Sequence, residues 1–323
     1  MEISVVICTR NRPDTIGQAV DSVACCDPLP LAIHVMDQST DTRTREIVDA
    51  LAEQRRGQTA IVYHHLDRAG LSRAYNLGIR ACSTEVIALT DDDVVVPPDW
   101  IGCIAEAFAQ DPALGLLYGQ VLVPRELQDA RQRGFIVPNL SIPRRERLMR
   151  GGPFRVFGMG ANMALRRSSF DRVGGFDEAL GGGGPLRSSQ DFDYAYRTYL
   201  VGDAILFEPS VKVDHYGTRT TDQWPDTMRN YGIGDGAFYS KHIRCGDLRA
   251  LRMFSRIVLR WWLRETKSFL LRRPGDDYGR NLRVGIRDGL KYPIDKKRRL
   301  YLETATATFG VTQSNVVTGA QKN

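Results

Sequence analysis

The chain has 323 residues, of which 42% are hydrophobic and 25% are charged. These proportions are near the globular average and exclude a wholly disordered or fibrous chain. Six cysteines without a C-x-x-C pair predict free thiols rather than a disulfide framework or a zinc site. No segment approaches the ~18 apolar residues of a membrane span, and the first residues lack the basic segment of a signal peptide. We therefore expect a soluble, cytoplasmic protein.

The net charge of +6 is unevenly distributed along the chain. Residues 241–300 contain 18 Lys and Arg against 6 Asp and Glu, whereas residues 1–240 contain 25 against 31. A mildly acidic body with a strongly basic segment predicts that the last third meets an anionic surface. Membrane phospholipid, nucleic acid and an anionic substrate all remain open, because charge alone does not choose among them.

The first part of the chain alternates strand-like and helix-like segments. Strands are expected at 3–8, 31–36, 60–64 and 85–90, with helices at 16–23, 45–55 and 72–81 between them. Continuous apolar strands between amphipathic helices predict a parallel sheet that is covered on both faces. Ligands bind at the carboxyl ends of such strands, and the polar clusters 9–12, 37–41 and 91–93 follow three of them.

The rest of the chain is less regular. Short strands are expected at 116–123 and 211–214, and the four glycines at 181–184 favour a loop over a site. Beyond residue 225 the pattern is helical and basic. The residues after 305 are predicted to form a disordered tail.

Three consecutive carboxylates follow the predicted strand 85–90. Asp91, Asp92 and Asp93 repel one another, so the arrangement is costly without a cation or a cationic partner. Their hard oxygen ligands suit Mg²⁺ or Mn²⁺, and Asp91 and Asp93 point the same way on an extended chain. A solvated turn with a helix N-cap is the alternative for the run in isolation.

Several segments together resemble family 2 glycosyltransferases. They read I-S-V-V-I-C-T-R-N-R-P at 3–13, V-M-D-Q-S-T-D at 35–41, G-L-S-R-A-Y-N-L-G at 70–78, A-L-T-D-D-D at 88–93, G-G-F-D-E at 174–178 and Q-D-F-D-Y-A-Y-R at 190–197. The resemblance covers residues 1–220. It implies an α/β GT-A fold, with a mostly parallel Rossmann-like sheet and helices on both faces, a nucleotide-sugar donor, a divalent metal (Mg²⁺ or Mn²⁺) and transfer with inversion.

The resemblance also implies a division of the chain. Residues 1–220 would form the catalytic domain, with a nucleotide-binding half at 1–110 and an acceptor-binding half at 111–220. A basic helical appendage at 221–304 and the tail at 305–323 would follow.

Roles for the donor side follow from the resemblance as well. The residues expected to contact the nucleotide are Thr9, Arg10, Arg12, Asp37, Arg73, Asn76, Asp91 and Asp92. Asp37 would read the base, although an Asx turn is its structural alternative. Asp93 would be the direct metal ligand, with Asp91 and His215 completing the site. A lone histidine such as His215 is otherwise more often structural or solvated.

Asp191 is the expected general base, since an inverting transfer needs one group that deprotonates the acceptor hydroxyl. The family has an acidic pair here, and this chain has Gln190 in the first position. A helix N-cap is the alternative role for Asp191. The residues expected near the sugars are Gly160, Asn162, Gln190 and Trp224, and core packing is the alternative for Trp224.

We therefore expect an enzyme that transfers one sugar from a nucleoside-diphosphate sugar, by family frequency a UDP-sugar, to a glycan or lipid-linked acceptor. Ile257 stands where processive members have the Gln of Q-x-x-R-W, which favours single-sugar transfer. The Arg- and Trp-rich segment 249–273 resembles an interfacial helix on an anionic membrane, such as the inner face of the plasma membrane.

Four other interpretations stay open or are disfavoured. The segment 249–273 could instead pack on the catalytic domain. A GT-like module that binds a nucleotide-sugar or a membrane without turnover is the alternative function. A sugar nucleotidyltransferase would need a glycine-rich loop after the first strand, and this chain has Cys8-Thr9-Arg10-Asn11 there. A nucleic-acid binder would explain the basic segment, but no recognition motif is present.

Overall fold

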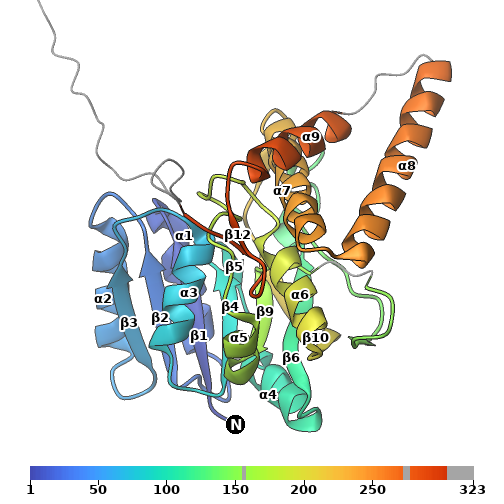
Figure 1. Cartoon of the computed structure of the whole chain (residues 1–323). Helices are drawn as coiled ribbons and strands as arrows, with labels where there is room; N and C mark the ends of the chain where they lie inside the picture. Colours follow the sequence, from blue (N-terminus) through green and yellow to red (C-terminus); the bar gives the residue numbers. More distant parts are fainter. Residues whose placement is uncertain (155–157, 272–276, 304–323) are drawn as a thin grey trace, which may run out of the picture.

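The computed structural model describes residues 1–154, 158–271 and 277–303. A central sheet runs through the molecule (Figure 1). Its strands are β1 (Ile3–Thr9), β2 (Ala32–Asp37), β3 (Ala60–His65), β4 (Val86–Asp91), β5 (Val94–Val95), β6 (Leu114–Leu122), β8 (Glu146–Leu148), β9 (Asn162–Arg166) and β10 (Ala204–His215). They lie in the order β3-β2-β1-β4-β9-β6-β10-β5, and β8 pairs with β10.

The strand directions confirm the expected mostly parallel sheet. β1, β2, β3 and β4 form parallel pairs, and β6 and β10 form another. β9 is antiparallel to both β4 and β6, so it joins two groups of strands that point the same way. β5 and β8 are antiparallel to β10. Two small pairs complete the strands: β7 (Phe135–Ile136) with β11 (Arg219–Thr220), and β12 (Ile294–Asp295) with β13 (Leu300–Tyr301).

Helices cover both faces of the sheet. The helices are α1 (Pro13–Ala24), α2 (Arg43–Gln54), α3 (Leu71–Ala81), α4 (Trp100–Gln110), α5 (Arg167–Val173), α6 (Gln190–Val201), α7 (Trp224–Arg244), α8 (Leu248–Leu270) and α9 (Tyr278–Gly289), with a 3₁₀ turn at Arg125–Leu127. Side chains alternate across β1: Val5 and Ile7 belong to a core with α1, α2 and α4, whereas Val6 belongs to a core with α3, α5, α6 and α7. This two-sided burial explains why the strands are continuously apolar.

Strand register brings the predicted polar clusters together. β1 and β4 pair so that Cys8 lies beside Asp91, at the carboxyl ends of both strands. The chain then passes through β5, where Val94 pairs with His215 at the end of β10. The carboxylate run and the distant histidine therefore meet at one edge of the sheet.

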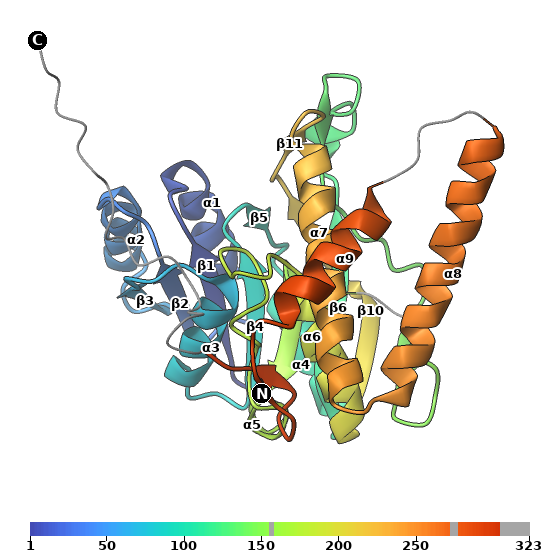
Figure 2. The same cartoon turned by 45° about the horizontal axis from the view of Figure 1, so that its top comes forward.

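The basic C-terminal region is joined to the rest of the molecule through α7. Phe238 and Tyr239 of α7 and Leu282 of α9 lie in the same core as Tyr194 of α6. The chain therefore has no break in packing near residue 220, and the division into domains stays a proposal. α8 lies at the outer edge of the molecule (Figures 1 and 2). No helix in the described part of the chain is long and apolar enough to cross a membrane. The predicted tail at 305–323 lies outside the described residues.

A fully buried set of charges connects α6 to α7. Lys241 of α7 contacts the carboxylates of Asp177 and Asp193, the second at 2.7 Å. Arg197 also donates to Asp193 at 2.8 Å, and His242 lies 2.9 Å from it. Two carboxylates thus face two permanent cations, while burial lowers the pKa of His242 to about 4 and keeps it neutral. Hydrogen-bonded pairing of this kind makes burial of the charges tolerable.

Replacing Lys241 with methionine is expected to destabilise the fold by about 3–5 kcal/mol, because two buried carboxylates lose their shared cation. The free energy of unfolding from urea denaturation measures the effect. Lys267→Met on the exposed surface of α8 is the control. Equal midpoints for the two variants would contradict the role given to Lys241.

Candidate active site

Three side chains at the edge of the sheet form a candidate metal site. One ligand atom each of Asp91, Asp93 and His215 lies within 4.8 Å of the other two. Asp93 and His215 are buried, and His215 Nε2 is 3.3 Å from Asp93 Oδ1. Two carboxylates and one imidazole suit Mn²⁺, and the carboxylates alone also suit Mg²⁺. The residues present therefore fit a divalent cation.

Arg12 and Thr9 donate hydrogen bonds to the second and third carboxylates of the run, Asp92 and Asp93. The Arg12 guanidinium donates to Asp92 at 2.9 Å and to Asp93 at 2.6 Å. Thr9 Oγ1 donates to the second oxygen of Asp92 at 2.6 Å. Both oxygens of Asp92 are thus bound by the protein. This arrangement relieves the repulsion that the sequence predicts among three adjacent carboxylates.

The electrostatic environment gives the two candidate carboxylate ligands, Asp91 and Asp93, different pKa values. Burial and the nearby charge of Asp93 raise the pKa of Asp91 to about 7. Burial also acts to raise the pKa of Asp93, but His215 and Arg12 outweigh it and hold that pKa at about 2. A bound divalent cation would favour the ionised form of both carboxylates.

A cavity of about 370 Å³, here called the donor cavity, opens beside these residues. Seven residues of the sequence-predicted site line it: Thr9, Arg10, Arg12, Asp91, Asp92, Asp93 and His215. Gln38 and Arg219 also line it and were not predicted, and Gly182 and Gly183 line it too. The glycine run at 181–184 thus borders a cavity, as the sequence favours.

Three residues predicted to contact the nucleotide lie outside the lining of the donor cavity. Asp37 is buried, accepts from the Ser39 amide at 2.8 Å and from the Tyr63 hydroxyl at 2.9 Å, and so forms the Asx turn of the alternative reading. The Asn76 amide bonds to the backbone of Phe176 on both its atoms. Their nucleotide contacts stay predictions, and these polar atoms already have partners.

Arg73 is the third such residue. Its guanidinium lies 3.6 Å from the Glu178 carboxylate and is about one third exposed. A surface pair of this length contributes little to stability. Its contact with a nucleotide stays a prediction.

Asp191 lies in a second cavity of about 580 Å³, here called the acceptor cavity. The residue stands in the first turn of α6, after the left-handed Ser189, so it is not the N-cap. Its carboxylate accepts from the backbone N–H of Gly160 at 3.2 Å and of Phe192 at 2.8 Å. Burial raises its pKa to about 6, which these two hydrogen bonds oppose and the charge of Asp235 reinforces.

The residues predicted near the sugars divide into two groups. Gly160, Gln190 and Trp224 line the acceptor cavity. Asn162 is fully buried: its amide accepts from the Trp100 indole at 3.0 Å and donates to backbone carbonyls of β6 and β10. A sugar contact by Asn162 stays a prediction, because its amide is occupied by the protein.

Sequence reasoning missed the contribution of α7 to the acceptor cavity. Asp235 lines it, is held by Ser189 at 3.0 Å and Tyr278 at 2.8 Å, and supplies a carboxylate although position 190 has none. Tyr231 was missed too. The only sequence signal was an acidic residue within the glycine-rich segment 232–236, inside a region that reads as basic and helical.

The two cavities adjoin. Leu71, Asp91, Pro138, Met159 and Tyr231 line both of them. Asp91 therefore stands between the candidate metal site and the cavity that contains Asp191. A donor in one cavity and an acceptor in the other would meet at this boundary.

The comparisons identify the family. The model of glycosyl transferase family 2 matches residues 4–174, and the chain belongs to this family. A glucosyl-dolichyl phosphate glucuronosyltransferase of Haloferax volcanii is 23% identical over 75% of this chain and 77% of its own length. A pre-mycofactocin glycosyltransferase of Mycobacterium tuberculosis is 27% identical over 81% of this chain, which spans only 52% of that protein. Family and relatives support glycosyltransferase activity.

Solved structures show the same fold. A mannosyltransferase of Pyrobaculum calidifontis, solved with GDP-Man and Mn²⁺, matches with a TM-score of 0.56 and 20% identity over 75% of this chain and 64% of that one. GalNAc-T7, solved with UDP, GalNAc and Mn²⁺, matches with a TM-score of 0.52 and 18% identity over 75% of this chain and 50% of that one. The GT-A fold expected from the sequence is confirmed.

Replacing Asp93 with asparagine is expected to lower the Mn²⁺ affinity. The loss should exceed the roughly 10–100-fold that follows when a residue that only hydrogen-bonds to a metal ligand is replaced. The reason is that Asp93 is one of the three candidate ligands and its carboxylate would bind the ion directly. Electron paramagnetic resonance of free Mn²⁺ in titrations with UDP measures the affinity. Asp49→Asn, which removes an exposed carboxylate on α2, is the control. Unchanged affinity in Asp93→Asn would rule out this metal site.

Proposed function

We propose that the protein is a metal-dependent inverting glycosyltransferase that moves a single sugar from a nucleoside-diphosphate sugar to an acceptor hydroxyl, with Asp191 as the general base. The observation that carries the proposal is the shared boundary of the two cavities at Asp91. It separates a nucleotide side lined by arginines and aspartates from the buried carboxylate of Asp191, which forms no ion pair with any described residue. An inverting displacement needs this division, with the base on the face opposite the leaving nucleotide.

On the donor side, Asp91, Asp93 and His215 would hold Mn²⁺ or Mg²⁺. The bound cation would neutralise the charge that develops on the departing diphosphate. Arg12 fixes the orientation of Asp93 through its guanidinium, and Arg10 and Arg219 add positive charge to the lining. We infer that these residues bind and orient the nucleotide.

On the acceptor side, Asp191 would accept the proton of the attacking hydroxyl. Two backbone N–H groups fix its carboxylate, so the base is oriented before the acceptor binds. Its raised pKa makes it a stronger base than an exposed aspartate while leaving it ionised above pH 6. Asp193 cannot replace it, because that carboxylate is bound by Arg197 and Lys241.

The donor nucleotide and the acceptor are proposed from the relatives. A UDP-sugar is supported by structural neighbours solved with UDP, although the Pyrobaculum calidifontis mannosyltransferase holds GDP-Man. A glycan or lipid-linked acceptor is supported by the glucosyl-dolichyl phosphate glucuronosyltransferase among the relatives. Binding of 249–273 to an anionic membrane on the inner face of the plasma membrane also stays a proposal. Residues 272 and 273 of that segment lie outside the described part of the chain.

Asp191→Asn is expected to lower the rate of sugar transfer by roughly 10²–10⁴-fold, the usual contribution of a general base. Release of nucleoside diphosphate from UDP-, GDP- and dTDP-sugars with Mn²⁺ and an extract of glycans and lipids measures the rate. Asp171→Asn, an exposed carboxylate on α5, is the matched control. Wild-type turnover in Asp191→Asn would refute the assigned base. Metal-dependent nucleotide binding without turnover in any protein would favour a non-catalytic module.

The rate is expected to fall as the pH drops through about 6, because only ionised Asp191 accepts a proton and burial holds its pKa there. The other titratable groups that interact electrostatically with Asp191 are Asp235, Tyr75, Tyr118 and Tyr231. The tyrosines stay neutral because burial raises their pKa values. Asp235→Asn removes a negative charge that raises the pKa of Asp191, so the midpoint of kcat/KM against pH should move lower. A midpoint near pH 4 in the wild type would contradict the assignment.

A further inference from the structure

The acceptor cavity is negatively charged. Its lining includes three carboxylates, Asp91, Asp191 and Asp235, and no lysine, arginine or histidine among the described residues. The adjoining donor cavity is lined by three arginines and a histidine as well as by aspartates. Asp91 would bind the cation on the donor side, so Asp191 and Asp235 are the charges that an acceptor meets. Asp191 is the proposed base, which leaves the carboxylate of Asp235 without an assigned ligand.

Close packing of the α7 backbone fixes the position of Asp235. Glycines precede and follow it in the chain. A Cβ at Gly234 would lie 2.7 Å from the backbone carbonyl of Ser188, and one at Gly236 would lie 2.9 Å from the backbone nitrogen of Ile286 in α9. Both distances are shorter than a van der Waals contact. The backbone of α7 therefore packs directly against the segment before α6 and against α9, and Asp235 stands where these elements meet.

Two neutral hydroxyl groups bind the carboxylate of Asp235. Ser189 donates to one oxygen at 3.0 Å, and Tyr278 donates to the other at 2.8 Å. Asp235 forms no ion pair with any residue that the structure describes, and burial raises the pKa of its carboxyl group. Each oxygen of a carboxylate accepts about two hydrogen bonds, so both oxygens keep an acceptor site. A largely buried carboxylate with unused acceptor sites and no cation is stabilised by a further donor.

Asp235 and the proposed base belong to one cavity of about 580 Å³. Asp235 is hydrogen-bonded to Ser189, two residues before Asp191, and its charge acts on the pKa of Asp191. A ligand that fills the cavity therefore reaches both carboxylates. Trp224 and Tyr231 add aromatic surface to the lining, against which the C–H groups of such a ligand can pack. A ligand suited to this lining carries at least two hydrogen-bond donors and no negative charge.

We propose that Asp235 determines acceptor specificity: it accepts a hydrogen bond from a second hydroxyl group of the acceptor unit whose attacking hydroxyl is deprotonated by Asp191. The same carboxylates exclude a unit that carries a carboxylate or a phosphate, because its charge would be buried beside two aspartates without a cation. The restriction applies to the unit inside the cavity and not to what is attached to it. The inference rests on the proposed function, since it assigns the acceptor chemistry at that site.

Asp235→Asn tests the hydrogen bond, because it keeps the shape of the side chain and removes its charge. The donor is the nucleotide-sugar that the wild type cleaves, and the acceptors are the methyl glycosides of glucose, galactose and mannose. Hydrolysis of the donor by water is measured in parallel. Water has no second hydroxyl group, so the ratio of transfer to hydrolysis should fall by roughly 10–100-fold, mainly through a higher KM for the acceptor. At pH 8 Asp191 is ionised in both proteins.

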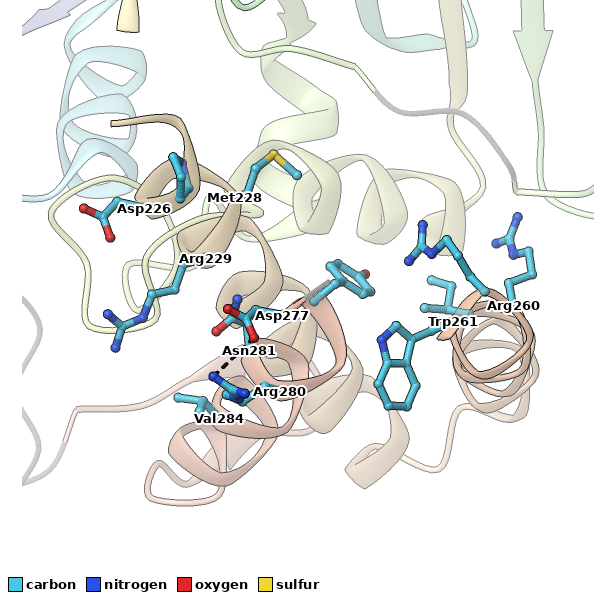
Figure 3. Close-up of a pocket in the computed structure, with 13 residues that line it drawn as sticks. Asp226, Met228, Arg229, Arg260, Trp261, Asp277, Arg280, Asn281 and Val284 are labelled. Atoms are coloured by element: carbon cyan, nitrogen blue, oxygen red, sulfur yellow. Dashed lines mark ion pairs between the residues drawn. The ribbon is translucent and has the colours of Figure 1, made fainter. Parts of the chain in front are cut away.

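Two further variants separate ligand binding from a merely structural role. Asp226→Asn removes the same charge from an exposed position of α7 that lines another cavity, of about 950 Å³, between α7, α8 and α9 (Figure 3). It should keep the wild-type ratio. Tyr278→Phe removes a hydrogen bond to Asp235 but leaves the carboxylate, so it should lower the ratio less than Asp235→Asn does. An unchanged ratio in Asp235→Asn, or equal losses in Asp235→Asn and Tyr278→Phe, would overturn the proposal.

The exclusion of negative charge is tested with paired acceptors. The methyl glycosides of glucuronic and galacturonic acid differ from those of glucose and galactose by a carboxylate in place of a hydroxymethyl group. The wild type should show a kcat/KM at least roughly tenfold higher for each neutral glycoside than for its charged counterpart, and Asp235→Asn should narrow that difference. Equal or faster transfer to the charged glycosides, or no transfer to any neutral one, would overturn the proposal.

The inference and the proposed function fail in different ways. Absence of Mn²⁺-dependent nucleotide binding, or donor hydrolysis that Asp191→Asn does not slow, would refute the proposed function. Hydrolysis that depends on Asp191, together with an unchanged ratio of transfer to hydrolysis in Asp235→Asn, would refute the inference alone.

Discussion

The buried contacts of Lys241 determine how α7 fits against α6 and the segment after α5. This side chain of α7 contacts Asp177 in the segment after α5 and Asp193 in the first turn of α6. The Tyr301 amide of β13 also donates to Asp177 at 3.0 Å, so the last described strand joins the same set. A buried carboxylate without a cation is expensive, so the contacts that these elements share hold them against one another.

That arrangement fixes the acceptor side of the proposed active site. Asp191 precedes Asp193 by two residues on α6, so the helix that is bound to α7 also directs the candidate base into the cavity. α7 in turn supplies Asp235 and Tyr231 to the wall of the same cavity. The helix that appears in the sequence as the start of a basic appendage is therefore part of the site.

The sequence predicted the features that depend on local pattern and strand ends. The parallel strands and the position of the run Asp91–Asp93 at a strand end follow from the local pattern. The approach of His215 was expected from the family resemblance alone, and it comes about through the pairing of β5 with β10. The sequence could not predict which polar side chains form hydrogen bonds within the protein and so are not free to bind a ligand. Asn162 and Asn76 carry the same chemistry as a ligand-binding amide, but tertiary contacts saturate them. Nor could composition reveal that Asp235 turns inward, since an isolated acidic residue in the middle of a helix leaves no periodic signal.

The central claim is that one buried carboxylate, on the acceptor side of a metal-nucleotide site, drives a single displacement at the sugar. The most direct measurement is the anomeric configuration of the first product formed by the wild-type protein, from the ¹H NMR coupling constant of the transferred sugar. With an α-linked UDP-sugar as donor, the account predicts a β-linked product from the earliest time point. An α-linked first product would mean retention of configuration, and a single displacement assisted by Asp191 would then be excluded.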